Sequence, residues 1–415
     1  MSWLQKSIPL TWLKLIFRSL NHRNYQYYFW GQCISLMGTW IQNIALGWLV
    51  YRLTGSVIFL GVMAFAVHIP SLVITPFAGV YADRLNRQKT LIITQLLAMF
   101  ITIALALVVL FELVTVWNLM VFAVLIGIVN AFDTPFRHAF VMELVGNRDD
   151  LPNAIALNST LFNAARFIGP IIGGILISLV GEGWCFMING ISFLAVVVSL
   201  RLIRVEPFKP VLQTQSTLLQ LKEGLNYSWN NKPVRYLLLM IAVTGFAGLP
   251  FQSFLPAFAS GILQGGAPLL GMLTGSLGAG ALAGALYLAS RQNIRSLPKG
   301  ILFSVVIFVG GMSVFSQSLW PAVSMMGLAV AGFGMIFLFN ATNTLLQTIT
   351  DDSKRGRMVS LYSLTFMGIP PLGSLAMGAV AELAGIAFTV LVSALICLAT
   401  VFLLRKKIKG VEQLL

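Results

Sequence analysis

The chain has 415 residues, of which 58% are hydrophobic and 10% are charged, and its formal net charge is +14. A soluble protein of this length has too small an interior for so many apolar side chains, so the composition excludes that class. The three cysteines lie in apolar segments without metal-type spacing, which indicates neither a disulfide framework nor a metal site. The sequence therefore predicts an all-α polytopic membrane protein.

Windowed hydropathy predicts twelve transmembrane helices, since about 20 apolar residues cross a hydrocarbon core of about 30 Å. The first six are expected at residues 25–51, 56–82, 90–111, 117–143, 152–180 and 184–203. The second six are expected at residues 234–262, 267–290, 300–317, 320–348, 357–384 and 386–404. The first apolar run follows a long polar lead and shows no small-residue cleavage site, so we expect it to be retained as a span.

Basic residues fall almost entirely on one side of these spans, and such residues stay on the cytoplasmic side of a membrane. This asymmetry predicts that both termini are cytoplasmic, and it explains the net charge by membrane orientation rather than by nucleic-acid binding. The predicted inner side carries Lys6, Lys14, Arg18, Arg23, Arg84, Arg87, Lys89, Arg148, Arg291, Arg295, Lys299, Lys354, Arg355, Arg357, Arg405, Lys406, Lys407 and Lys409, whereas the outer side carries Arg52 with Glu112, Glu182 and Glu382.

Two short patterns recur about half a chain apart, as in transporters built from parallel six-helix repeats. They are "NAFDT" at 130–134 with "NATNT" at 340–344, and Pro170 and Gly173 with Pro370 and Gly373. We therefore predict two pseudo-symmetric six-helix bundles. The N-terminal bundle is expected over residues 1–203, a cytoplasmic linker over 204–233, and the C-terminal bundle with a basic tail over 234–415.

The linker contains one candidate helix. Its apolar residues recur at helical spacing, which predicts an amphipathic helix that lies on the membrane surface. These residues are Leu218, Leu221, Leu225 and Trp229.

Between the second and third expected spans the chain reads "GVYADRLNRQKT", residues 79–90. This segment resembles the loop signature of the major facilitator superfamily, G-x-x-x-D-R-x-x-R-R/K, with Gly79, Asp83, Arg84 and Arg87 at the matching positions. The resemblance implies a twelve-helix transporter fold. It also implies that the glycine allows close helix approach and that the charged residues latch the two halves on the cytoplasmic side. The alternative is that the basic residues only set the topology.

The fifth expected span contains "NAARFIGPIIGG", residues 163–174, which resembles the drug/proton antiporter motif G-x-x-x-G-P-x-x-G-G. Gly169, Pro170, Gly173 and Gly174 match, while Ala165 replaces the first glycine. The resemblance implies gating by a bent helix and transport outward, whereas a packing seam without directional meaning is the alternative. Other segments, such as "SKRGRMVSLYSL", resemble the branch that contains the enterobactin exporter and macrolide efflux proteins.

Charged side chains inside the expected spans are candidate functional groups, because a charge within a bilayer is costly. Asn130, Asp133 and Arg137 share one face of the fourth span, and Asn163 and Arg166 share one face of the fifth. If these spans are antiparallel neighbours, Asp133 and Arg166 lie about 6 Å apart in depth and can pair. Asp133 is then either a proton-coupling group or part of a permanent ion pair.

His68 is the second candidate for proton coupling, because imidazole titrates near neutral pH, although a packing role is the alternative. In the superfamily the first, fourth, seventh and tenth spans line a central cavity, and most of the interior polar residues fall on those spans. A surplus of arginine over aspartate favours an anionic, oxygen-rich substrate. The candidate cavity residues are Gln32, Asn43, Asn130, Arg137, Asn163, Arg166, Gln252, Asn340, Asn343 and Gln347.

The sequence contains no nucleotide-binding loop, catalytic triad spacing or paired metal ligands, so neither an enzyme nor a cofactor is expected. We expect a monomeric secondary transporter of the bacterial inner membrane. It exports an amphipathic, anionic small molecule, such as a siderophore or a toxic compound, by proton antiport. An importer of such a solute on the same fold, a lysolipid flippase and a non-transporting receptor are the alternatives.

Overall fold

The computed structural model of the chain describes residues 17–145, 148–205, 217–291, 293–351 and 354–411. Lys6, Lys14 and linker residues 206–216 lie outside these residues. All regular structure within the described ranges is helical. In these ranges, twelve helices are long and apolar enough to cross a membrane, as the sequence predicts.

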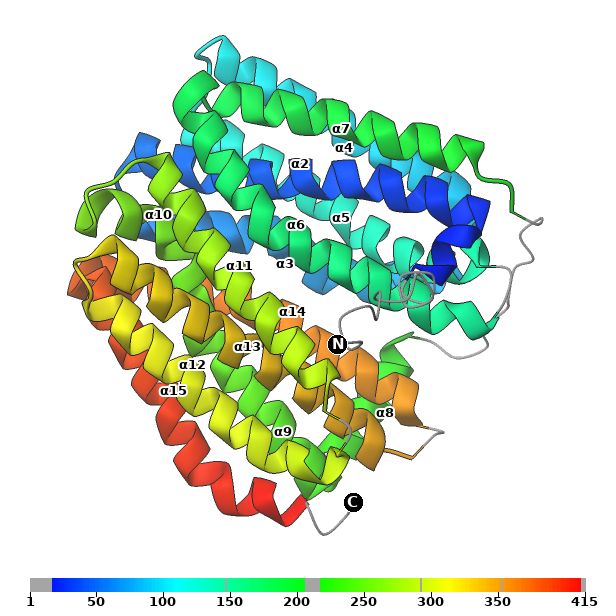
Figure 1. Cartoon of the computed structure of the whole chain (residues 1–415), viewed down its shortest axis with the longest axis vertical. Helices are drawn as coiled ribbons and strands as arrows, with labels where there is room; N and C mark the ends of the chain where they lie inside the picture. The colour runs from blue at the N-terminus through cyan, green and yellow to red at the C-terminus, as the bar shows by residue number, and fades with distance from the viewer. Residues whose placement is uncertain (1–16, 146–147, 206–216, 292, 352–353, 412–415) are drawn as a thin grey trace, which may run out of the picture.

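The first six spans form an N-terminal bundle and the last six a C-terminal bundle (Figure 1). In the N-terminal bundle α2 packs against α6 and α7, α3 against α5, and α4 against α5 and α7. The short turns η1 (Arg18–Asn21) and η2 (Arg148–Asp150) precede α2 and α6. The six helices are α2 (Arg23–Thr54), α3 (Val57–Ala82), α4 (Arg87–Leu110), α5 (Val116–Leu144), α6 (Leu151–Val180) and α7 (Glu182–Leu202).

The C-terminal bundle begins with a span that is not a continuous α-helix. Proline has no backbone N–H, so Pro250 and Pro256 interrupt the α-helical hydrogen bonds, and 3-10 and π turns take their place. The segments of this span are α9 (Lys232–Val243), η3 (Thr244–Gly248), η4 (Leu249–Phe254), α10 (Leu255–Ala257) and η5 (Phe258–Ile262). The other helices are α11 (Ala267–Ala289), α12 (Leu297–Gln317) after turn η6 (Ile294–Ser296), α13 (Pro321–Ile349), α14 (Arg355–Ala384) and α15 (Ile386–Lys409).

The predicted linker helix is present as α8 (Thr217–Asn230), which packs against α9 and α14. An ion pair of 2.8 Å between Glu223 and Arg357 fixes α8 to the C-terminal bundle. Leu225 and Trp229, one turn apart, expose 54% and 70% of their surface. These exposed apolar side chains suit an interfacial helix, and its place on the membrane surface stays a prediction.

The sequence repeat corresponds to an equivalence between the two bundles. In each bundle the first span packs on the fifth and sixth, the second on the fourth, and the third on the fourth and sixth. The repeated Pro/Gly pattern packs α6 against α2, the first span of its bundle, and α14 against η3 in the seventh span. The structure thus confirms the predicted pseudo-symmetry.

The two bundles meet along two seams, α3 with α14 and α6 with α11. We call the end that carries α8 and the described chain ends the terminal end, and the opposite end the far end. A Cβ on Gly61 would lie 2.3 Å from the Ser374 carbonyl oxygen, and one on Gly174 would lie 2.5 Å from that of Ala267. The bundles therefore touch backbone to backbone near the far end. Toward the terminal end they spread apart (Figure 1).

Replacing Gly61 with leucine is expected to lower the melting temperature in detergent by about 5 °C, because overpacking this seam costs about 1–3 kcal/mol. Gly79 lies on the same helix, and a Cβ there would meet nothing within 4 Å. Gly79→Ala is therefore the matched control, with an unchanged or slightly raised melting temperature. Equal losses in the two variants would contradict the far-end seam.

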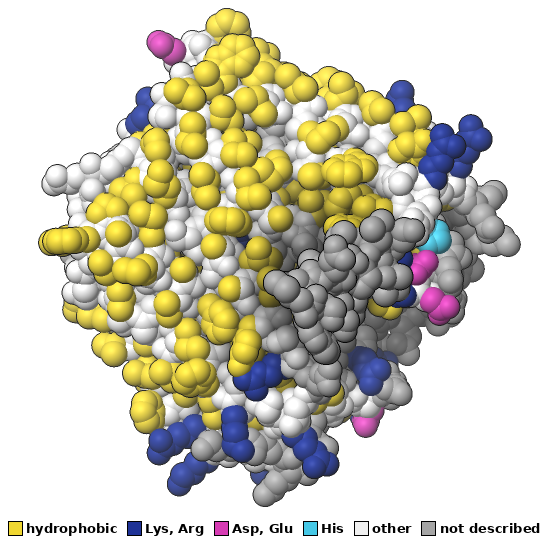
Figure 2. All heavy atoms as spheres, in the orientation of Figure 1, with side chains coloured by type: hydrophobic (Ala, Val, Ile, Leu, Met, Phe, Trp, Pro, Cys, Tyr) yellow, Lys and Arg dark blue, Asp and Glu magenta, His cyan; other side chains and the backbone are white. Residues whose placement is uncertain are grey.

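The outer surface of the bundles is apolar, with charge confined to its ends. Figure 2 shows hydrophobic side chains over most of one face, with Lys and Arg gathered mainly toward the terminal end. At the far end Arg52 forms a 2.8 Å ion pair with Glu182 of the same bundle. The surface thus has the apolar band and the one-sided basic charge of a membrane-spanning protein.

Candidate functional site

One face of α6 changes from accessible to buried along its length. Ile155 and Phe162 expose 55% and 46% of their surface, Arg166 is half-buried, and Pro170 and Ile177 are buried, although all five share one helical face. This face lies between the side of α6 that packs on α2 and the side that packs on α11. It therefore borders the space between the bundles, which is open toward the terminal end and closed beyond Arg166.

The inner face of α2 changes at a similar depth. Asn43 is exposed, whereas Leu46 and Val50 farther along the helix are 8% and 0% exposed. The two helices together define a cavity that ends near Asn43 and Arg166, and we call this closed end the cavity ceiling. Of the predicted cavity residues, Asn43, Asn163, Arg166 and Gln252 lie at or near the ceiling.

Arg166 connects the two bundles at the ceiling. Its Nη2 donates to Oε1 of Gln252 at 3.1 Å, and its guanidinium carbon lies 5.9 Å from the centre of the Trp40 ring. Gln252 belongs to the broken seventh span, and its Nε2 lies 3.6 Å from the sulfur of Met335 on α13. Interrupted helices near the middle of the membrane are common places for transport sites.

The predicted ion pair between Asp133 and Arg166 is wrong in this structure. Asp133 is 3% exposed, and its Oδ2 lies 3.2 Å from Nη2 of Arg137, one turn along α5. The prediction assumed that the fourth and fifth spans are neighbours. Instead α5 packs mainly on α3 and α4, whereas α6 packs on α2 and α11. Similar depth in the membrane therefore did not bring the two side chains together.

Two residues of α4 complete the Asp133 site and were missed by the sequence analysis. The Thr94 hydroxyl and the Gln95 amide nitrogen lie 3.0 and 2.7 Å from Oδ1 of Asp133. Gln32 of α2 accepts a 3.4 Å hydrogen bond from Arg137. The adjacent polar pair within the apolar run "LIITQLLAMF" was the available signal. These contacts form a buried polar network within the N-terminal bundle.

His68 is exposed on α3 and forms one helical face with Leu72, Thr75 and Gly79. Leu72, Thr75 and Gly79 line a pocket of about 350 Å³ between α3 and α14, toward the terminal end. His68 is thus an accessible imidazole one turn beyond Leu72 toward the far end, outside the residues that line the pocket. Its accessibility contrasts with the burial of Asp133.

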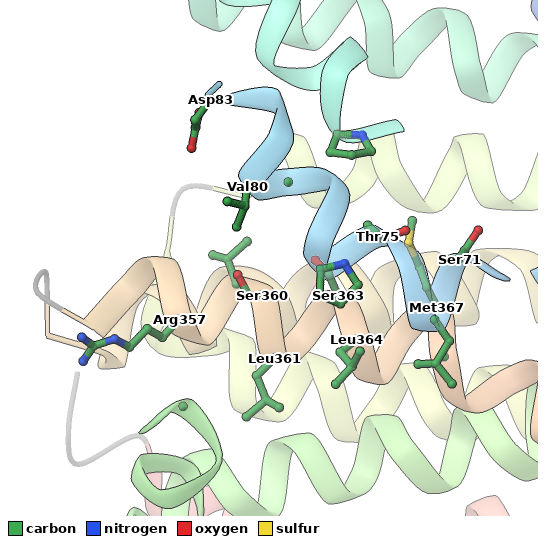
Figure 3. A pocket seen from close by; sticks show the side chains of 17 residues that line it. Ser71, Thr75, Val80, Asp83, Arg357, Ser360, Leu361, Ser363, Leu364 and Met367 are labelled. Carbon is green, nitrogen blue, oxygen red and sulfur yellow. The ribbon is translucent and has the colours of Figure 1, made fainter. Parts of the chain in front are cut away.

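The pocket has walls from both bundles. In Figure 3, Ser71, Thr75 and Asp83 are carried by one helix, and Arg357 and Ser363 by the helix that faces it. Hydroxyl groups alternate with apolar side chains along both walls, and the two charged residues lie toward the terminal end. The lining is therefore amphipathic rather than wholly apolar.

Among the described residues, the contacts given for the loop motif stay within the N-terminal bundle, whereas the sequence suggested a latch between the bundles. Arg87 binds Glu143 of α5 at 2.6 Å, Asp83 at 3.3 Å and the Ala82 carbonyl at 2.9 Å, all within the N-terminal bundle. Glu143 was missed, although it stands at the end of the fourth predicted span. Gly79 has no close neighbour, and Arg84 is exposed. Both observations follow from the separation of the bundles at the terminal end.

The Gly/Pro motif of α6 packs on two sides. A Cβ on Gly169 would lie 2.5 Å from Cβ of Trp40, and one on Gly173 would lie 3.1 Å from Cα of Ile41, both on α2. Gly174 instead faces α11 in the other bundle. The motif therefore brings α6 close to a helix of each bundle.

The polar residues predicted on the tenth span lie nearer the terminal end, apart from the contact of Arg166 with Gln252 at the ceiling. Asn340 is exposed, while Gln347 donates to Asn343 at 3.1 Å on the same helix. Asn130 is exposed on α5. Four predicted cavity residues belong to the C-terminal bundle. Among the described contacts, Gln252 is the one of these four that bonds to the N-terminal bundle, through Arg166.

A second polar contact between the bundles lies at the far end. Oε2 of Glu382 on α14 accepts hydrogen bonds from the backbone N–H groups of Val57 and Ile58, at 2.8 and 3.2 Å, and from the Ser56 hydroxyl at 3.0 Å. These donors form the N-terminus of α3, where a carboxylate is favoured by the unpaired N–H groups and the helix dipole. Glu382 therefore caps a helix of the opposite bundle.

Two pseudo-symmetric bundles around a cavity closed at one end are the architecture of a membrane transporter, and the family and relatives that match the chain place it in the major facilitator superfamily rather than among enzymes. Residues 16–414 match the model of the transmembrane secretion effector family, so the chain belongs to that family.

Relatives and solved structures agree with this assignment. The staphyloferrin A transporter of Staphylococcus aureus is 24% identical over 92% of this chain and 97% of its own length, and the multidrug efflux pump Tap of Mycolicibacterium fortuitum is 28% identical over 85% and 88%. Macrolide efflux protein A of Streptococcus pyogenes is 23% identical over 89% and 93%. A bacterial ferroportin homologue in an inward-facing state has a TM-score of 0.70 at 16% identity, over 92% of this chain and 98% of that one. The low identity makes this last likeness one of fold.

Proposed function

We propose that the chain exports an amphipathic, anionic small molecule from a bacterial cell by alternating access, in exchange for protons. In this proposal it is a monomer in the inner membrane with both termini in the cytoplasm. The observation that carries it is the cavity open toward the terminal end, where the basic side chains gather. Because basic loops stay in the cytoplasm, substrate enters from the cytoplasm in the state described.

The substrate class is supported by the relatives and by the interior charge. Proteins named for staphyloferrin A, multidrug and macrolide transport all handle small molecules. Asp133 is already paired with Arg137, so Arg166 leaves the interior of the N-terminal bundle with a surplus positive charge. A cationic substrate is therefore disfavoured relative to an anionic one.

Alternating access requires the far-end seams to open while the terminal end closes. In this proposal α3 approaches α14 during closure, so the space beside Gly79 is filled and Asp83 nears Arg357. These residues face the same pocket from opposite walls (Figure 3). The loop motif then acts as a latch in the closed state.

Substrate-driven proton release from everted membrane vesicles tests the proposed export. Vesicles that contain the protein and an acidic interior, reported by acridine orange quenching, are expected to regain fluorescence when staphyloferrin A is added. Vesicles without the protein provide the background. No recovery with staphyloferrin A, a macrolide or a lysolipid would contradict proton antiport.

His68 is the proposed proton-coupling residue, because of the two predicted coupling residues it is the accessible one, whereas Asp133 is buried in an ion pair. His68→Gln is expected to abolish substrate-driven recovery of fluorescence. His138→Gln is the matched control, since His138 is also exposed but lies on α5 nearer the terminal end. Equal coupling in the two variants would remove His68 from the mechanism.

A lysolipid flippase is the second candidate, favoured by the amphipathic pocket between α3 and α14. Headgroup-labelled lysolipid would then move between leaflets in proteoliposomes, and staphyloferrin A would release no protons. An importer would instead accumulate solute in intact cells.

A further inference from the structure

Arg166 is a guanidinium without a carboxylate partner in the part of the chain that the structure describes. Among the described residues, its side chain donates one hydrogen bond, to the neutral amide of Gln252 at 3.1 Å. Asp133, the buried carboxylate in the interior of the N-terminal bundle, lies 3.2 Å from Arg137 and is held by two further polar groups. The charge of Arg166 is thus left uncompensated within a membrane-spanning helix, where charge is costly.

The position of Arg166 makes that charge available to a ligand. It is half-buried at the cavity ceiling, with accessible side chains on the same face toward the terminal end. A guanidinium carries five N–H donors in a planar fork that matches a carboxylate, and one of them is used here. Several donors therefore remain for a ligand that enters the open cavity.

The neighbours of Arg166 suit a particular kind of ligand. The guanidinium carbon lies over the Trp40 ring at 5.9 Å from its centre, and the Phe162 ring lies 5.8 Å from that of Trp40, so the charge has an aromatic wall. An aromatic or flat apolar group next to a carboxylate would fit both the ring and the charge.

The same contact holds the bundles together. Arg166 belongs to the N-terminal bundle and Gln252 to the C-terminal one, so their hydrogen bond crosses the interface at the ceiling. A carboxylate is a stronger acceptor for a guanidinium than an amide, because the hydrogen bonds are charge-assisted and form in pairs.

We propose that Arg166 binds the carboxylate of the transported molecule, which displaces Gln252 and so removes this polar contact between the bundles. The inference rests on the proposed transport function and identifies the substrate as an aromatic or otherwise apolar carboxylate. Arg166 thereby links substrate binding to opening at the far end. A ligand shifts a conformational equilibrium only by binding its states unequally, and displacement of Gln252 supplies that difference.

The test is carboxylate selectivity of the purified protein in detergent, measured by isothermal titration without a proton gradient. The probes are 1-naphthaleneacetate and its neutral amide, which share the ring and differ in charge. Wild-type protein is expected to bind the carboxylate at least about tenfold more tightly. Arg166→Gln is expected to bind both equally, and Arg166→Lys to keep a smaller preference because it retains the charge without the fork.

Gln252→Glu provides a variant in which Arg166 is intact. Its new carboxylate would pair with Arg166 permanently, so preference for the naphthalene carboxylate is expected to disappear while amide binding persists. Gln317→Glu is the matched control, because Gln317 ends α12 at the far end and bonds to its neighbour Ser316 away from the ceiling, and its preference is expected to be unchanged.

Absence of carboxylate binding by the wild type, or an undiminished preference in Arg166→Gln, would overturn the inference. Because no gradient is used, failure of proton antiport leaves this result standing. Conversely, substrate-driven proton release together with equal binding of the acid and the amide would contradict the role of Arg166 and leave the proposed antiport intact.

Discussion

Replacement of Asp133 with alanine is expected to lower the free energy of unfolding by about 2–3 kcal/mol and to reduce export in parallel. The side chain of Asp133 is 4% exposed and faces that of Arg137, which is 29% exposed. Removal of the carboxylate therefore leaves a partly buried guanidinium without its counter-ion. Thr94 and Gln95 lose a partner in the same step. Breaking a fully buried ion pair costs about 3–5 kcal/mol, and the partial exposure of Arg137 reduces that figure. Thermal unfolding in detergent measures the loss.

A double variant separates a structural role of Asp133 from a role in proton coupling. Asp133→Asn with Arg137→Gln removes both charges at once, so no uncompensated charge remains in the network. We expect it to recover most of the melting temperature and to keep substrate-driven proton release. If stability returns while proton release is lost, Asp133 carries the proton and the structural interpretation is wrong.

The spans were predictable because a membrane-spanning helix needs a long apolar run and makes all its backbone hydrogen bonds within the helix. The clearest difference is at the end of α15, predicted to stop at residue 404 and observed to continue to Lys409. Lysine and arginine favour helix, so the backbone continues after hydropathy falls. Hydropathy therefore predicts which segment lies in the bilayer better than it predicts where the helix ends.

The pairing of side chains was less predictable, because depth along a helix says nothing about which helix lies beside it. Asp133 and Arg166 lie at similar depths but on helices that pack against different neighbours. The partner of Asp133 instead stands four residues away on the same helix. Helical spacing alone would have proposed Arg137, since residues at i and i+4 are adjacent.

The contacts between the bundles were hidden from the sequence for a related reason. The contact of Gln252 with Arg166 joins residues 86 positions apart, and that of Glu382 with Ser56 joins residues 326 apart. No local pattern links such positions. The sequence repeat predicts that the two bundles have similar folds. It does not predict how one bundle is placed against the other, because that depends on the conformational state.

Replacing Glu382 with alanine is expected to shift the protein toward a state open at the far end. Its carboxylate accepts three hydrogen bonds from the start of α3 in the opposite bundle, and these must break when the far end opens. Because the site is exposed to solvent, the net effect is about 1 kcal/mol, or about a fivefold change in the ratio of the two states.

Cysteine labelling in proteoliposomes measures this shift. The three native cysteines are replaced by alanine, and the reporter is Leu46→Cys, at a position 8% exposed on the closed side of the ceiling. A membrane-impermeant maleimide applied at the far end is expected to react about fivefold faster in Glu382→Ala.

Arg52→Gln is the control for that experiment, because it breaks an ion pair with Glu182 at the same end but within one bundle. Its labelling rate is expected to match that of the reporter protein alone. The distinction is physical: a contact within a bundle is kept in both states, so its loss changes stability without changing their ratio. A contact between bundles exists in one state only. Equal labelling rates in the Glu382→Ala and Arg52→Gln variants would therefore show that Glu382 does not hold the far end closed.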